Sequence, residues 1–200
     1  NSVTNKLISL YHLFHLPKSS LQQFREGWGN DEIAFEVPGV SIPCVSVHRG
    51  PFSNYHTHLD DFSLFHEKSF NESKNLIKNI ILDLDKNYTV EVKNWSGLIS
   101  LANPSVDLYI EPRTVYNVKE DTNLEEFSFF KDLLPIEKKY LKANEKNIIR
   151  FSNKFQSYLS HNTKSTIIDL AYEFSLPVTF VEKYFKSLED KGFVSLIYKN

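Results

Sequence analysis

The chain has 200 residues, of which 41% are apolar, and a formal net charge of −2 at neutral pH. This composition supports one large or two small domains with an ample core, and the slight acidity identifies no class of partner. A single cysteine, Cys44, excludes a disulfide framework within the chain and favours a reducing, cytoplasmic compartment. No apolar run reaches the roughly 18 residues of a membrane span and no signal peptide is visible, while the lack of methionine suggests processing or a fragment of a longer chain.

Two helices are expected near the start of the chain. Residues 3–16 carry apolar side chains at near-helical spacing, which predicts an amphipathic helix that ends before Pro17. His12 and His15 are three residues apart and could share a face of this helix. Ordinary helix positions are the favoured interpretation, because no third ligand is suitably spaced. Residues 19–26 predict a second, short helix.

An apolar run and a polar loop follow. Val40–Val47 predicts a strand buried on both faces, and Cys44 within it is interpreted as a packed small hydrophobe. His56, His58 and the carboxylates that follow lie just after this run. Imidazole and carboxylate are ligands that zinc takes when it keeps a position open for water, and open α/β sheets place their sites beyond the carboxyl ends of strands. The alternative interpretation is a polar loop with solvated histidines.

The loop resembles a known signature. Tyr55-His56-Thr57-x-x-Asp60 is similar to the Tyr-His-Thr-x-x-Asp motif of zinc aminopeptidases in the bacterial leucyl-aminopeptidase and glutaminyl-cyclase superfamily. The histidine of that motif is the family's last zinc ligand, so the resemblance implies that His56 binds zinc. Upstream, residues 29–32 resemble the family's Gly-Ser-Asp-(His or Glu) loop, and residues 38–43 its Gly-x-x-(x)-Pro strand entry.

The resemblance is strongest to a bacterial branch of aminopeptidase-like proteins with an extra C-terminal winged helix. In that branch the motif reads close to Tyr-His-Thr-Ser-Leu-Asp-Asp-Leu, so His58 is a departure from it. The resemblance implies that neighbouring side chains orient the zinc-bound histidine or shape a pocket for the substrate amine. These residues are Asp60, Asp61, Tyr55, Arg49, Asp31 and Glu32. For the last two, a polar loop that caps a helix is the alternative interpretation.

The family's other metal ligands have no counterpart upstream. They are a His-x-Asp pair, an acidic bridging residue and a Glu-Glu pair, and none of these precedes Gly29. Glu125-Glu126 is a Glu-Glu pair, but it follows the signature and falls in an expected linker. One imidazole does not hold a catalytic zinc. A zinc site would therefore need an upstream segment or another chain, and whether the protein is an enzyme stays open.

The middle of the chain changes from helical to extended character. Ser69 and Glu72 have the spacing of a capping box, and the apolar stripe that follows predicts a helix to about Asp85. Residues 88–118 contain short β-prone runs separated by Asn-Pro and Glu-Pro, which predict a small β connector. Residues 121–131 are acidic and turn-rich at their start and make a plausible boundary.

The C-terminal third predicts a winged helix. A long helical stretch is expected over residues 135–159, and Thr166 with Asp169 caps the next helix. A turn at residues 175–177 leads into a further helix that ends at Gly192. A terminal strand is expected over residues 193–198. Helix, tight turn, helix and strand is the winged-helix order.

DNA binding is disfavoured for this winged helix. Residues 137–200 carry 11 Lys and Arg against 7 Asp and Glu, so the region is mildly basic. The expected recognition helix has no Arg, Asn or Gln, the side chains that most often read base edges. It exposes instead Thr179, Glu182, Lys183, Lys186, Glu189 and Asp190. Alternating charge is typical of a solvated or protein-docking face.

The predicted organisation is α/β with three parts. Residues 1–87 form the closing portion of an aminopeptidase-like α/β sandwich, residues 88–134 a β-rich connector, and residues 135–200 an α+β winged-helix domain. The leading hypothesis is the C-terminal part of a zinc-dependent aminopeptidase-like hydrolase that acts on a small peptide or amino-acid derivative. A non-catalytic interaction module that docks proteins and a DNA-binding regulator are the alternatives. No membrane partner is expected.

Overall fold

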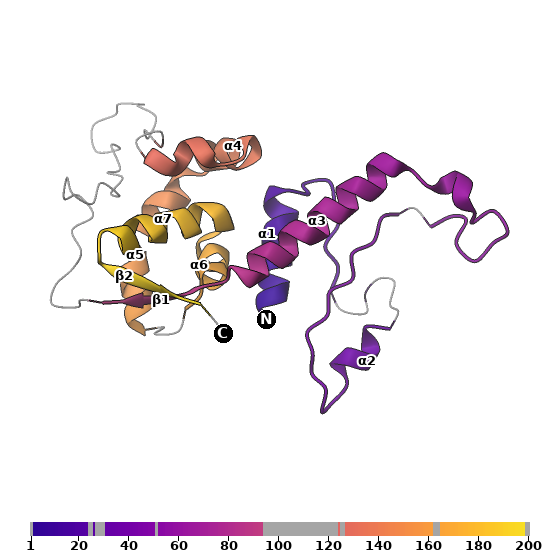
Figure 1. Ribbon diagram of the computed structural model, residues 1–200, viewed down its shortest axis with the longest axis horizontal. Helices are drawn as coiled ribbons and strands as arrows, with labels where there is room; N and C mark the ends of the chain where they lie inside the picture. Colours follow the sequence, from indigo (N-terminus) through magenta and orange to yellow (C-terminus); the bar gives the residue numbers. More distant parts are fainter. Residues whose placement is uncertain are drawn as a thin grey trace.

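The computed structural model describes residues 2–23, 26, 31–50, 52–93, 124, 127–161 and 165–198. Within them the fold is mainly helical with a small antiparallel sheet (Figure 1). The elements are α1 (Val3–Phe14), α2 (Ile33–Glu36), η1 (Phe62–Leu64), α3 (Glu67–Asp85), β1 (Thr89–Val92), η4 (Ser128–Asp132), α4 (Pro135–Ala143), α5 (Glu145–His161), α6 (Ile167–Phe174), α7 (Val178–Asp190) and β2 (Val194–Ile197). The mixture of helix and strand agrees with the expected α/β character.

An aromatic core holds the helical body together. Phe151 and Phe155 of α5 meet Tyr184 of α7 edge to face, with ring centroids 4.9 and 5.7 Å apart. Phe129 of η4 packs against Phe180 of α7, with ring centroids 5.7 Å apart. Each such pair adds about 0.5–1.5 kcal/mol to the gain from burial. Helix α7 is thus the central element of the body, with packing partners on several sides.

The sheet joins distant parts of the chain. β1 and β2 pair antiparallel, with Val90 opposite Leu196, and Val90 also donates its backbone N–H to the Ser165 carbonyl at 3.1 Å. Val90 and Val194 are almost fully buried because the inner face of this ribbon packs on the helical body. The strand over residues 89–92 was expected in a connector. The structure pairs it with the terminal strand of the C-terminal region.

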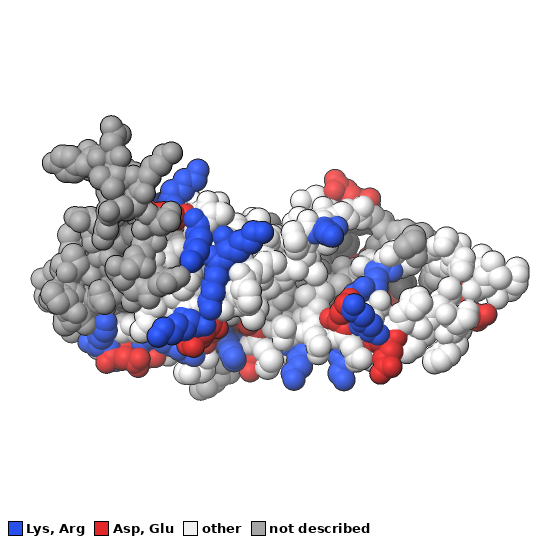
Figure 2. All heavy atoms as spheres, turned by 90° about the horizontal axis from the view of Figure 1, so that it is seen from above, with Lys and Arg blue, Asp and Glu red and all other residues white. Residues whose placement is uncertain are grey.

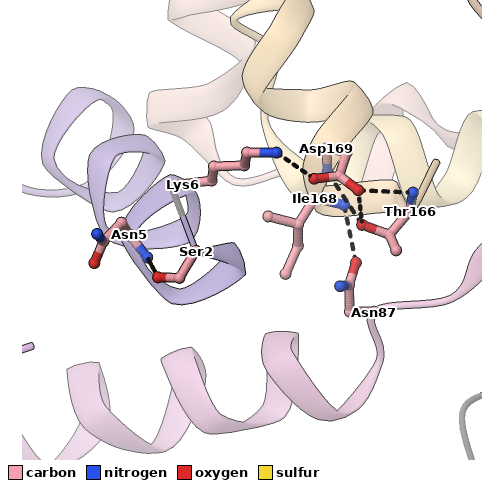
Figure 3. Close-up of polar contacts among 7 residues, drawn as sticks. All are labelled: Ser2, Asn5, Lys6, Asn87, Thr166, Ile168 and Asp169. Atoms are coloured by element: carbon pink, nitrogen blue, oxygen red, sulfur yellow. Dashed lines mark hydrogen bonds and ion pairs between the residues drawn. The ribbon is translucent and has the colours of Figure 1, made fainter. Parts of the chain in front are cut away.

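The N-terminal helix also packs on this body. Leu7, Leu10 and Phe14 of α1 are buried, and α1 contacts α6, α3 and α4. At the start of α6, the predicted capping box of Thr166 and Asp169 is confirmed (Figure 3). Lys6 and Asn87 reach the same helix end from α1 and from the residues after α3, as Figure 3 shows.

The helices of the C-terminal region are mostly as predicted. The helix over residues 178–190 and the strand over residues 194–197 are confirmed, and Gly192 has the positive φ of 79° that its C′ position favours. The helical stretch expected over residues 135–159 is confirmed, but Asn144 divides it into α4 and α5. Its backbone N–H turns back to the carbonyls of Tyr140 and Leu141.

Three expectations for the first half need correction. The described residues of the short helix expected over 19–26 are not helical. Helix α3 begins at Glu67 with His66 at its N-cap, so Ser69 lies inside the first turn and does not cap it. The helix predicted over residues 3–16 ends at Phe14, two residues early. The β runs expected between residues 97 and 118 and the Glu125-Glu126 pair lie outside the described residues.

The buried strand expected over Val40–Val47 is wrong for this structure. These residues form no strand, and Val40, Ile42 and Val47 are 47, 51 and 46% exposed. Cys44 is half-buried and lies outside the core. A strand buried on both faces needs neighbours at its edges and cover on both sides. In Figure 1 this segment runs beside α2, away from the two-stranded sheet.

In the part of the chain that the structure describes, every helix is too short or too polar to cross a bilayer.

Candidate functional site

The signature residues lie on an exposed loop between the extended segment and α3. Residues 53–56 form a turn, in which His56 has a φ of 63°. Few non-glycine residues adopt this left-handed conformation, although histidine does so more readily than most. The Tyr55 and His56 rings are stacked, with centroids 4.0 Å apart, and both side chains are exposed. The turn therefore presents the His56 imidazole at the surface.

Hydrogen bonds within the loop hold the residues that follow. The Thr57 hydroxyl donates to the Asn54 carbonyl at 2.6 Å and accepts from the Leu59 N–H at 3.2 Å. The Asp60 N–H donates to the Thr57 carbonyl at 3.2 Å. The Thr57 hydroxyl thus stabilises the turn through two local hydrogen bonds, which gives a structural reason for threonine at this position.

Asp61 has a structural contact of its own. Its carboxylate accepts the Ser63 N–H at 2.8 Å and caps the short helix η1. Hydrogen bonds from the Ser63 hydroxyl and from the Ser63 backbone lower the pKa of the Asp61 carboxyl. Because the side chain is fully exposed, this shift indicates a capped loop and not a buried catalytic acid.

Arg49 lies against α3, and Asp31 and Glu32 lie at the start of α2. Arg49 bonds Glu72 of α3 at 3.1 Å, and both side chains are about half exposed. Asp31 and Glu32 begin the short helix α2, where their carbonyls accept the N–H groups of residues 34 and 35. Glu32 occupies the N-cap position without a side-chain capping bond. The alternative interpretation, a polar loop that caps a helix, is therefore partly confirmed. The loop leads into a helix, but the Glu32 side chain does not cap it.

These residues do not by themselves make a zinc site. Among the described residues, no group of three or more His, Cys, Asp or Glu side chains comes together in a way that could hold a metal ion. His56, His58 and Asp60 are all exposed. A catalytic zinc takes three protein ligands and an open position. The signature loop offers one ligand of the family type.

The expected recognition helix is engaged within the chain. On α7, the Thr179 hydroxyl donates to buried Glu137 at 2.6 Å, and Lys183 bonds Asp132 at 3.1 Å. Lys186 bonds Glu182 on the same helix at 2.6 Å, and Glu189 accepts a backbone N–H from β2. Most polar groups of this face thus have partners in the chain itself, which leaves little for base recognition.

Two groups of residues were not anticipated from the sequence. In a small cavity of about 10 Å³ between α1, α3, α4 and α7, the Tyr11 hydroxyl donates to Asp83 at 2.6 Å. Burial raises the pKa of Asp83 and outweighs the opposing effect of the Tyr11 hydrogen bond. The second group is a groove of about 380 Å³ lined by Phe130 and four lysines, Lys131, Lys138, Lys139 and Lys142. The sequence signal for this groove is the recurrence of lysine at positions 138, 139 and 142 of α4.

Comparison with known proteins finds a family match for one part of the chain. No curated protein and no solved structure matches the chain significantly. Residues 5–87, which run from α1 to the end of α3 and include the signature loop, match the family described as Domain of unknown function (DUF4910).

Proposed function

We propose that this chain is the C-terminal part of a zinc-dependent aminopeptidase-like hydrolase. Its substrate would be a small peptide or amino-acid derivative. In this proposal the segment around His56 completes an aminopeptidase-like α/β sandwich, and β1, α6, α7 and β2 form a winged-helix unit attached to it. The other metal ligands would come from an upstream segment or a partner chain.

The exposure of the apolar segment before the signature carries this proposal. Val40, Ile42 and Val47 are each about half exposed, although their sequence has the character of a strand buried on both faces. Monomeric proteins rarely expose large contiguous apolar patches without an interaction to make. An extended segment whose backbone forms no strand in the described structure can add to the edge of a sheet. A larger α/β domain would supply such an edge.

The loop geometry supports a role for His56 at the rim of that domain. In the proposed assembly the apolar segment ends close to the site, and the left-handed turn at His56 directs the chain back toward α3. Residues held in uncommon backbone conformations cluster at functional sites. Thr57 and Asp61 already stabilise the turn and η1 through local hydrogen bonds. The loop would therefore enter the assembly partly pre-organised.

Activity measurements on the assembled protein test the proposal. The chain would be produced together with its natural upstream segment or copurifying partner, and hydrolysis of aminoacyl-4-nitroanilides and metal content would be measured. His56→Ala should abolish hydrolysis and lower the zinc content with little loss of stability, because its side chain is exposed. His58→Ala is the matched control and should be mild. If His58→Ala proves damaging while His56→Ala is silent, the resemblance has been aligned wrongly.

A non-catalytic docking module is the second candidate function. The observation in its favour is the internal engagement of α7, whose lysines bond carboxylates of the same chain. A winged helix used in this way serves as a scaffold and not as a DNA reader. Normal zinc binding and hydrolysis in the assembled protein would exclude this candidate as the whole function.

A further inference from the structure

A groove between η4 and α4 gathers positive charge on one side of the helical body. Its lining consists of Phe130 and the side chains of Lys131, Lys138, Lys139 and Lys142, and its volume is about 380 Å³. Figure 2 shows Lys and Arg side chains gathered over α4. No acidic side chain of the described residues lines the groove. The feature is independent of the signature loop and of the proposed hydrolase function.

The nearby acids of η4 and α4 each bond to a residue of α7. Glu137 lies on the same helix as three of the lysines, but it is only 1% exposed. Its carboxylate accepts the Leu134 N–H at 2.9 Å and the Thr179 hydroxyl at 2.6 Å. Asp132, next to Lys131, is 64% exposed but pairs with Lys183 of α7 at 3.1 Å. Both carboxylates of η4 and α4 are thus committed to contacts with the body.

Two of the lysines are held in place over a common aromatic ring. The Nζ atoms of Lys138 and Lys142 lie 5.9 and 6.0 Å from the centroid of Phe130. Lys138 Nζ also donates to the Lys131 carbonyl at 2.7 Å. These contacts reduce the rotamer freedom that ligand binding would otherwise have to restrict. The positive charges are therefore partly pre-organised.

We propose that this groove binds an acidic polypeptide segment of a partner protein. Lysine ammonium groups are compact point charges that attract carboxylates without the bidentate geometry that arginine provides. The lining has no Arg, Asn or Gln to read bases. Its aromatic ring, Phe130, is 4% exposed and so is not available to stack on bases. Charge complementarity with a run of Glu or Asp thus fits the groove better than nucleic acid.

Fluorescence anisotropy with the full chain tests this proposal. The probes are a labelled peptide of alternating Glu and Gly, the same peptide with Gln in place of Glu, and a labelled DNA duplex. The variant Lys131→Gln/Lys139→Gln removes two charges whose side chains are exposed. The matched control, Lys74→Gln/Lys78→Gln, removes two exposed charges from α3. Circular dichroism would establish that both variants fold as the parent does.

The acidic peptide should bind at about 50 mM salt and be released as salt rises to about 200 mM, because the attraction is between exposed charges. The groove variant should weaken binding about tenfold, and the control less than about twofold. The Gln peptide and the duplex should bind more weakly than the Glu peptide. Equal losses in both variants, no binding of the Glu peptide, or tighter binding of the duplex would each overturn the proposal.

Discussion

Lys6 Nζ lies 2.6 Å from Asp169 Oδ1, although the two residues are 163 positions apart in the chain. Both side chains are largely buried, with 25 and 20% of their surface exposed. The same carboxylate accepts the backbone N–H of Thr166 at 3.1 Å and completes the capping box of α6. This one group therefore stabilises a helix end and fastens the N-terminal helix to the C-terminal region.

Replacing Asp169 by alanine should destabilise the protein by about 1–3 kcal/mol, since it removes part of a helix cap and a charge-assisted hydrogen bond. Lys6→Ala should cost less, because it leaves the cap intact. Urea unfolding followed by circular dichroism would measure both. Glu72→Ala is the control, because it breaks only the exposed Arg49–Glu72 pair and should cost at most about 0.5–1 kcal/mol. If all three variants lost the same free energy of unfolding, the Asp169 contacts would contribute no more than an exposed ion pair.

The contribution of Asp169 should depend on pH. Burial by itself would raise the pKa of this carboxyl, but the hydrogen bonds from Lys6 and Thr166 outweigh burial and lower it. A lowered pKa in the folded state gives stability that is present above the unfolded value of about 3.9 and is lost as the pH falls through the folded value. The difference in unfolding free energy between the parent chain and Asp169→Asn should therefore shrink below about pH 4. A difference that stays constant between pH 7 and pH 3 would contradict this assignment.

Two adjacent isoleucines on α3 should respond differently to truncation. Ile80 is 9% exposed and packs on the core, whereas Ile81 is 59% exposed. Ile80→Ala should cost about 2–4 kcal/mol, because it opens a cavity, and Ile81→Ala should stay within about 0.5 kcal/mol. Thermal and urea unfolding of the isolated chain would measure both. In the proposed larger assembly, Ile81→Ala should become destabilising if this face of α3 docks there.

The isolated chain should bind zinc weakly, because it offers one family-type ligand where a site needs three or more. Calorimetric titration of the metal-free chain would measure this, with His56→Ala and His58→Ala as variants. A tight stoichiometric site that survives both substitutions would place the metal elsewhere in the chain. Weak binding that disappears with His56→Ala would agree with the proposed role of this residue.

The sequence determined the elements whose signals are local. The apolar spacing of α7, the Thr166–Asp169 capping box and the glycine at position 192 each specify structure over a few residues, and all three are confirmed. The residues of the candidate site were also visible in the sequence, because the signature around His56 is a short continuous motif. Whether that motif forms a complete metal site could not be read from it.

Only the tertiary structure decided the contacts between distant residues. The pairing of Val90 with Leu196 and the bond between Lys6 and Asp169 join segments more than 100 residues apart, and no local pattern specifies such partners. Glu137 is a charged residue with no local signal for burial, yet the tertiary structure buries it against Thr179. The residues of Val40–Val47 have the character of a buried strand, but burial requires neighbouring strands. The described fold supplies none beside them, so they stay exposed.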